Sequence, residues 1–296
     1  MSDSLANLRR KISGAGELRS VVRTMKAVAA ANIGQYEKSV RSLVDYNRTV
    51  ELGLGACFRA NHDVPLVTEK KRKMQPGDIG AVIFGSDQGL VGQFNDVVVD
   101  FALKKITGFS VKPVVWAVGE RVHARVRDEN LSLMGLLPVP ISVNAITSLV
   151  GQILEETKNP KDYSEVTELH LFYNHPTSGS IYTPISIQLL PLNGHWRKRI
   201  ETFPWPTKTL PQVIDQGTTT LRAFIREYLF VSLFRACAES LASENASRLA
   251  AMQRADKNID ELLLSLNANF HRLRQSEIDE ELFDVVSGFE ALRKVR

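Results

Sequence analysis

Ser86 and Asp87 come closest, by type and position, to residues that could do chemistry. They close an apolar run and open the segment Ser86-Asp87-Gln88-Gly89-Leu90-Val91-Gly92-Gln93-Phe94-Asn95. A glycine-containing turn between a strand and a helix can bind an anion through its backbone N–H groups. The segment is neither a Gly-x-Ser-x-Gly elbow nor a Gly-x-x-x-x-Gly-Lys phosphate loop. A Ser-Asp pair in such a turn is more often a helix cap, so we expect capping here.

The histidines, cysteines and clustered acids do not indicate a catalytic or metal site. None of the six histidines has His-Glu-x-x-His spacing. His170 and His175 are five positions apart, which places them on opposite faces of a strand. Cys57 and Cys237 are too few for a disulfide framework or a Cys-x-x-Cys zinc site. The acidic run Asp279–Glu281 is typical of a solvated helix surface. We therefore predict no catalytic residue, metal or cofactor.

The charge balance also gives little support to nucleic-acid binding. The formal net charge of the 296 residues is only +4, and 44% are hydrophobic, as in ordinary globular proteins. The basic residues near the N-terminus spread around their predicted helix, which favours a solvated surface or an acidic protein partner. The sequence has no run of 18 apolar residues, and it begins without the apolar core of a signal peptide. We expect neither a transmembrane helix nor export.

The prolines divide the chain into three parts. All twelve lie between Pro65 and Pro211. Because proline breaks helix interiors, the two ends are predicted to be helical and the middle is not. The predicted domains are an N-terminal coiled-coil helix at 1–60, a central domain at 61–208 and a C-terminal coiled-coil helix at 209–296.

Both ends have the spacing of a coiled coil. In the N-terminal part, one seven-residue series is apolar apart from its tyrosine: Leu8, Ala15, Val22, Ala29, Tyr36, Leu43 and Val50. A second seven-residue series, which starts at Leu5, contains polar residues such as Arg19 and Lys26. These polar residues indicate that the seam is weaker along this series. Gly53 and Gly55 are expected to end this helix. The C-terminal helix of about 75 residues would reach roughly 110 Å. Its apolar stripe needs a partner, and the N-terminal helix packed antiparallel is the simplest.

The middle part alternates strand and helix patterns, which predicts a Rossmann-like α/β domain with a mainly parallel sheet. Strands are expected at Asp78–Ser86, Val111–Val118, Glu168–Tyr173 and Tyr182–Leu190, with helices near Val91–Ile106, Glu120–Asp128 and Val143–Thr157.

Seven separated segments form an ordered set along nearly the whole chain. The segments are Leu8–Ser13, Thr24–Ala30, Ser86–Asn95, Ile185–Leu192, Ala242–Met252, Arg274–Glu281 and Val285–Gly288. Together and in this order, they resemble the gamma subunit of F-type rotary ATP synthases, and the set is more specific than any one motif. The chain resembles a divergent bacterial member of this family, of the kind found in alternative rotary ATPases. Two departures stand out: Asp279 replaces a family threonine, and Val91 replaces a common cysteine.

The resemblance implies a non-catalytic rotor subunit that couples ion flow to ATP synthesis or hydrolysis. The terminal helices would form the central stalk inside the ring of alpha and beta subunits. The central domain would contact the epsilon subunit and the membrane c-ring, with no nucleic acid and no small-molecule substrate. The location implied is peripheral, on the cytoplasmic face of the bacterial inner membrane.

The resemblance also carries over a set of residues expected to contact the surrounding ring. The set is Met25, Lys26, Arg274, Gln275, Asp279, Glu280 and Glu281. Ordinary coil surface is an equally good explanation of these residues. Two other functions remain open: a coiled-coil scaffold with a globular head and no rotary role, and a nucleotide-binding α/β enzyme. The missing phosphate loop weighs against the enzyme.

Overall fold

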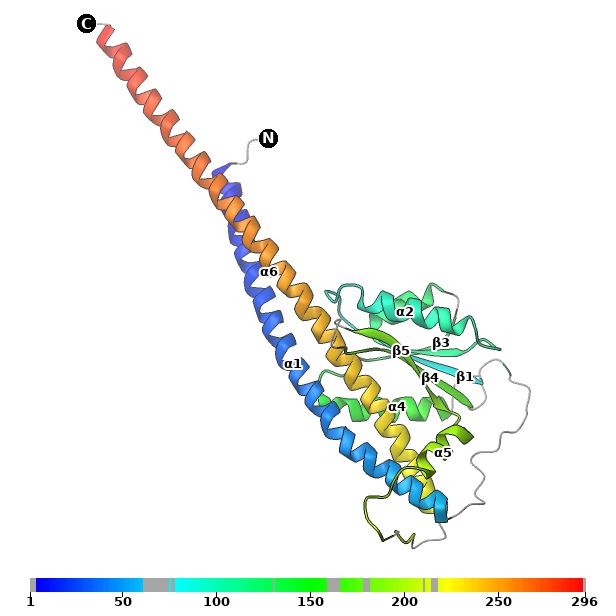
Figure 1. Ribbon diagram of the computed structural model, residues 1–296. Helices are drawn as coiled ribbons and strands as arrows, with labels where there is room; N and C mark the ends of the chain where they lie inside the picture. Colours follow the sequence, from blue (N-terminus) through cyan, green and yellow to red (C-terminus); the bar gives the residue numbers. More distant parts are fainter. Residues whose placement is uncertain are drawn as a thin grey trace. The chain divides into compact units, whose positions relative to one another are not determined.

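The computed structural model describes residues 4–60, 75, 78–129, 131–158, 166–177, 182–209, 211–213 and 218–294. In sequence, two long helices flank a segment of alternating strands and shorter helices (Figure 1). The elements are α1 (Leu5–Ala60), β1 (Ile79–Phe84), α2 (Phe94–Ile106), β2 (Val114–Val118), α3 (Glu120–Arg127), β3 (Ser132–Leu137), α4 (Val143–Lys158), β4 (Glu168–His175), β5 (Thr183–Leu190), α5 (Gly194–Glu201) and α6 (Thr218–Lys294).

Contacts divide the chain into two compact units. One unit, the coil unit, consists of Met1–Ala29 with Leu249–Arg296. The other, the α/β unit, is Ala30–Arg248. The helices α1 and α6 each contribute to both units.

The predicted heptad on α1 is confirmed by burial. In the series spaced by seven residues, Leu8, Ala15, Ala29, Tyr36 and Val50 are at most 6% exposed. The other two members, Val22 and Leu43, are half-buried. The apolar series therefore forms the buried seam of α1, as a coiled-coil pattern requires.

The predicted end of α1 at Gly53 and Gly55 is wrong, because the helix continues to Ala60. A Cβ atom on Gly53 would lie 2.4 Å from the ring of Phe224, and one on Gly55 would lie 2.8 Å from the carbonyl oxygen of Ile200. These glycines therefore let neighbouring segments approach the helix closely.

In the coil unit, the two helices run antiparallel. Arg19 of α1 pairs with Asp260 of α6, whereas Arg9, further toward the N-terminus, lies over the ring of Phe270. The C-terminal end of α6 runs past the first turn of α1 (Figure 1). Every side chain from Arg274 to Gly288 is exposed. This stretch of α6 thus has a free surface on all sides within the described chain.

The α/β unit is built on a five-stranded sheet with the order β3-β2-β1-β4-β5. The first four of these strands are parallel, and β5 is antiparallel to β4. The predicted mainly parallel, Rossmann-like sheet is confirmed, with strand ends shifted by a few residues. The strand β3 and the helix α5 were not among the elements predicted from the sequence.

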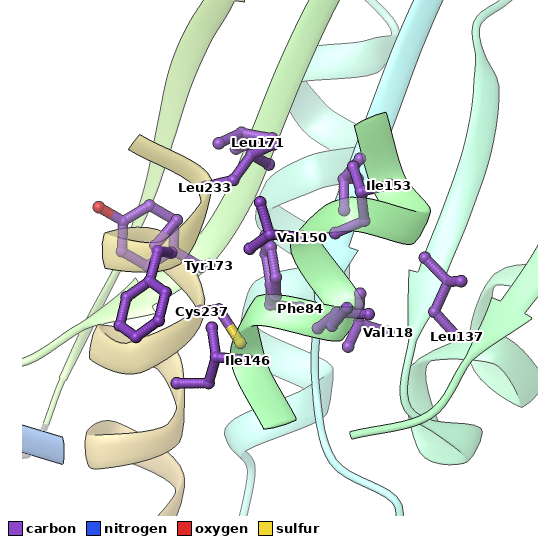
Figure 2. Packing of buried hydrophobic residues seen from close by; sticks show 14 of the residues in the cluster. Phe84, Val118, Leu137, Ile146, Val150, Ile153, Leu171, Tyr173, Leu233 and Cys237 are labelled. Atoms are coloured by element: carbon purple, nitrogen blue, oxygen red, sulfur yellow. The ribbon is translucent and has the colours of Figure 1, made fainter. Parts of the chain in front are cut away.

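Helices cover both faces of the sheet. One face packs with α4 and α6 in a cluster that includes Phe84, Ile146, Tyr173 and Cys237. Figure 2 shows α4 across this face, with Tyr173 of β4 next to α6, which carries Cys237. The opposite face packs with α2 and α3. Parallel sheets are normally covered on both sides in this way, and the continuous burial of β1 and β2 agrees with it.

Candidate functional site

The loop after β1, at residues 85–93, is held by its own side chains. Asn95 Oδ1 accepts from the Ser86 backbone N–H at 3.0 Å, and Asn95 Nδ2 donates to Ser86 Oγ at 2.9 Å. Ser86 Oγ in turn donates to the Gln88 carbonyl at 2.9 Å. Leu90 and Gly92 have positive φ angles of 63° and 58°. The Ser86 backbone N–H, the Ser86 hydroxyl and the Asn95 amide are therefore engaged with one another and with the Gln88 carbonyl.

Asp87 joins this loop to two other segments at the same edge of the sheet. Its Oδ1 accepts from the backbone N–H of Glu120 at 3.0 Å, at the start of α3. Its Oδ2 accepts from the N–H of Val139 at 3.1 Å. The predicted capping of the helix that follows this loop is wrong, because α2 begins after Gln93 without a side-chain cap hydrogen bond. Asp87 instead accepts from the first N–H of α3, a later helix. A carboxylate at a helix N-terminus is also favoured by the helix dipole.

The two strand histidines lie on opposite faces of β4, as predicted. His170 packs against the ring of Phe109 at 4.6 Å and pairs with Glu168 at 2.6 Å. His175 Nδ1 lies 2.8 Å from Glu239 Oε2 on α6. Within the residues that the structure describes, no three His, Cys, Asp or Glu side chains are grouped so that they could hold a metal ion.

Of the predicted ring-contact residues, Lys26 is engaged inside the coil unit. Its Nζ donates to Asp256 Oδ2 at 2.9 Å. Arg23 Nε also donates to Asp256, at 3.4 Å, and Arg19 Nη2 pairs with Asp260 at 2.6 Å. The hydrogen bond from Lys26 holds the pKa of the Asp256 carboxyl below its usual value, with help from Arg23. Met25 beside them is half-buried.

The other predicted contact residues lie together on the exposed end of α6. In the described chain, they form no hydrogen bond or ion pair with one another or with α1. These residues are Arg274, Gln275, Asp279, Glu280 and Glu281. The structure thus separates the predicted set into a partly buried pair on α1 and an exposed group on α6.

Large apolar side chains are exposed among these charged residues. Ile278 is 53% exposed, Leu282 60%, Phe283 70%, Val285 70% and Val286 48%. Isolated exposed apolar residues are ordinary, but five within nine positions of one helix form a surface suited to a protein partner. The sequence showed the apolar spacing here, but it could not show that α1 leaves it uncovered.

Sequence reasoning missed two polar contacts that hold α6 against the sheet. The Glu239 carboxylate accepts from the Tyr173 hydroxyl at 2.9 Å and from Arg235 Nε at 2.7 Å. Ser247 Oγ donates to the carbonyl of Val91 at 2.6 Å. The sequence signals these contacts only through a run of polar residues in α6, in a part of the helix whose side chains are buried.

One pocket lies beside the first of these contacts. It has a volume of about 300 Å³ and is lined by Glu37, Val40, Arg41, His175, Pro176, Glu239 and Ala242. Acidic and basic side chains are mixed around it, which does not favour a ligand of either charge. Among the helices that the structure describes, none has the length and apolar composition needed to cross a membrane.

Comparison with known proteins identifies the family. The model of the ATP synthase family ATP-synt matches residues 4–292. The ATP synthase gamma chain of Syntrophus aciditrophicus is 29% identical over 310 residues, covering 98% of this chain and 99% of that relative. The gamma chain of Mycolicibacterium smegmatis is 27% identical and covers 99% of each chain.

Two solved structures have the same fold. The chain aligns with the rotor of the Euglena gracilis mitochondrial ATP synthase at a TM-score of 0.63, with 16% identity, over 93% of this chain and 98% of that one. It aligns with the central stalk of the Tetrahymena thermophila mitochondrial enzyme at 0.52, with 21% identity, over 79% and 99%. Because the family match extends over almost the whole sequence, the chain belongs to the ATP synthase family, and the predicted resemblance to its gamma subunits is confirmed.

Proposed function

We infer that this chain is the central-stalk rotor subunit of an F-type ATP synthase. The observation that carries this function is the full-length match to ATP synthase gamma chains. The antiparallel terminal helices, which bracket a parallel-sheet domain, agree with it. The subunit couples ion flow through the membrane to ATP synthesis or hydrolysis in the surrounding subunits.

The terminal helices act as the shaft. A shaft must be stiff, and all twelve prolines lie outside α1 and α6. An asymmetric pair of helices presents a different face to each catalytic site. Rotation therefore changes the nucleotide affinity of each site in turn, which is a coupling free energy carried by a rigid element.

The exposed end of α6 is the part of the chain that fits inside the ring. Its surface combines Phe283 and Val285, each 70% exposed, with unpaired charges such as Arg274. A helix with this surface needs a protein around it in order to remove the apolar side chains from water. We assign Arg274, Gln275, Asp279, Glu280 and Glu281 to direct contact with the alpha and beta subunits.

We assign Met25 and Lys26 to the same ring contact on α1. Lys26 is already paired with Asp256, so it acts as part of an ion-pair cluster rather than as a free cation.

We also propose the division into an N-terminal coil helix at 1–60, a central domain at 61–208 and a C-terminal coil helix at 209–296.

The chain itself is non-catalytic in this proposal, and ATP turns over on the alpha and beta subunits. The α/β domain contacts the epsilon subunit and the membrane c-ring. The subunit is peripheral and lies on the cytoplasmic face of the bacterial inner membrane. In support, Ser86 and Asn95 bond to each other in the loop after β1, where a Rossmann-like domain could bind a phosphate.

Co-purification from native membranes tests this function. A tagged copy of the chain should bring down two larger nucleotide-binding subunits and ATPase activity. The tagged chain could instead be recovered alone while the larger subunits are present, assembled, in the same preparation. That result would favour a coiled-coil scaffold that has the fold of the family but no rotary role.

A further inference from the structure

The part of α6 that crosses the α/β unit is buried although most of its side chains are polar. The residues concerned are at most 5% exposed: Glu239, Ser240, Ser243, Glu244, Asn245 and Ser247. Burying polar groups costs free energy unless each one finds a partner, and apolar residues would hold a helix here more strongly. This segment therefore provides something other than maximal stability.

Glu239 forms the first of two contacts with the sheet. Its Oε2 accepts from the Tyr173 hydroxyl at 2.9 Å and lies 2.8 Å from His175 Nδ1, at the carboxyl end of β4. Its Oε1 accepts from Arg235 Nε at 2.7 Å, one turn earlier on α6. The Glu239 side chain is only 4% exposed. Burial, followed by the Glu239 charge, raises the pKa of the Tyr173 hydroxyl, so the phenol stays protonated and donates.

Ser247 forms the second contact, about 12 Å further along the helix axis. Its hydroxyl donates to the Val91 carbonyl in the loop after β1. The residue that follows the loop, Phe94 at the start of α2, is held by β4, since Asn174 Nδ2 donates to its carbonyl at 2.9 Å. Ser247 therefore bonds to a braced part of the sheet edge.

Both contacts lie at the carboxyl ends of β1 and β4. In doubly wound sheets, the strand order reverses at such a pair, and ligands usually bind in the crevice outside it. Here the Tyr173 hydroxyl, the His175 ring and the Val91 carbonyl of that edge contact α6 of the same chain. The position that related folds use for a ligand is used here to hold a helix.

Apolar contacts and hydrogen bonds constrain the position of α6 in different ways. Apolar contacts from Leu233, Cys237 and Leu241 hold α6 against the sheet, but they have no preferred bond direction. Hydrogen bonds weaken steeply outside a narrow range of distance and angle. The hydrogen-bonded contacts of Glu239 and Ser247 are separated along α6 and are made near the ends of different strands. Together they resist both rotation of the helix about its axis and sliding along it.

We propose that Glu239 and Ser247 are positioning residues that fasten α6 to the sheet at two points, so that torque passes between the α/β domain and the shaft without slip. The proposal rests on the function proposed above, because only a chain that turns needs such a fastening. Neither residue touches nucleotide in this account.

Matched substitutions on the same helix test the fastening. The test variants are Ser247→Ala, Glu239→Gln and the double variant. The controls are Ser232→Ala, whose hydroxyl bonds only the Tyr228 carbonyl one turn back, and Glu227→Gln, whose carboxylate accepts from Tyr46 at an exposed site. In the assembled complex, ions transported per ATP hydrolysed should fall to about half or less in the double variant and stay unchanged in both controls.

A second measurement uses the full chain alone, so the proposal remains testable if a variant fails to assemble. Hydrogen exchange of Ser247→Ala should accelerate at residues 85–95 and leave the buried strand β2 unchanged. An unaltered transport ratio in an assembled double variant, or unaltered exchange at residues 85–95, would overturn the proposal. Failure of the unsubstituted chain to assemble with ATP synthase subunits would instead count against the proposed function.

Discussion

Lys26 and Asp256 are 230 positions apart in sequence, and their side chains meet at 2.9 Å between Nζ and Oδ2. The pair joins α1 to α6 in the coil unit, at a seam position that the heptad pattern fills with a polar residue. Arg19 and Arg23 also lie within 4 Å of the Asp256 carboxylate. One acidic residue thus balances several cations on the facing helix, which fixes the pairing of the two helices at this level.

Replacing Asp256 by Asn should lower the thermal stability of the coil at neutral pH. The folded-state pKa of Asp256 is depressed, so its contribution is present above the unfolded value of about 4 and is lost as the pH falls through the folded value. The difference in Tm between the wild type and Asp256→Asn, followed by circular dichroism, should therefore shrink below pH 4.

Glu261→Gln is the matched control for this substitution. Glu261 pairs with Lys257 at 3.9 Å, and both side chains are more than 60% exposed. Such a pair contributes little, so the control should leave Tm nearly unchanged at both pH values. Equal decreases in Tm for the two variants would mean that Asp256 contributes no more to stability than an ordinary exposed ion pair.

Reversing the charge at Arg274 should uncouple ATP hydrolysis from ion transport. The side chain is exposed and unpaired within the described chain, and it lies on the part of α6 assigned to the ring. Arg222→Glu, also at an exposed position of α6, is the control because it lies at the other end of the helix. Simultaneous assays of proton or sodium transport and ATP turnover decide the point. A wild-type ratio in Arg274→Glu would remove this residue from the contact.

Two isoleucines of α4 and the loop before it should differ sharply in their effect on stability. Ile146 is fully buried between the helix and the sheet, whereas Ile141 is 93% exposed. Ile146→Ala should lower the free energy of unfolding by about 2–5 kcal/mol, because it removes buried methyl groups and leaves a cavity. Ile141→Ala should change it by no more than about 0.5 kcal/mol. Urea unfolding of both variants measures the two values.

Two glycines should respond to alanine with opposite signs. Gly119 has a φ of 105°, and a Cβ there would lie 2.8 Å from the Ser86 backbone, so Gly119→Ala should destabilise by about 1–3 kcal/mol. Gly151 lies within α4 and has open space around its Cβ position. Gly151→Ala should stabilise by about 0.5–1 kcal/mol. The same sign for both would contradict the backbone geometry described here.

The parts of the fold with regular local patterns were predictable. The series from Leu8 to Val50 identified the buried seam of α1 because each position repeats the same burial every two turns. The predominantly parallel sheet followed from β-branched runs such as Val114–Val118. Edge strand β3 was missed because its segment, Ser132–Leu137, contains glycine and no β-branched residue.

The candidate site was harder to predict because it depends on contacts between distant segments. Gly53 looked like a helix end, but its small size serves the close approach of Phe224. Lys26 looked like a free contact residue, but it pairs with Asp256. Ser247 and Val91 are 156 positions apart, and neither has a local pattern that indicates their hydrogen bond. The residues from Arg274 to Glu281 are exposed, and their contact with the surrounding ring stays a prediction.

Rotation of this chain is the central claim, and a probe attached to it tests that claim directly. Cys57 and Cys237 are each 1% exposed, and burial raises the pKa of both thiols, so they should react slowly with thiol reagents. A cysteine introduced by Ile141→Cys would be exposed and could carry a bead or a fluorophore. In the assembled complex held by its outer subunits, the account predicts stepwise rotation of the probe in one direction when ATP is added. A probe that stays still while the same complexes hydrolyse ATP would contradict it.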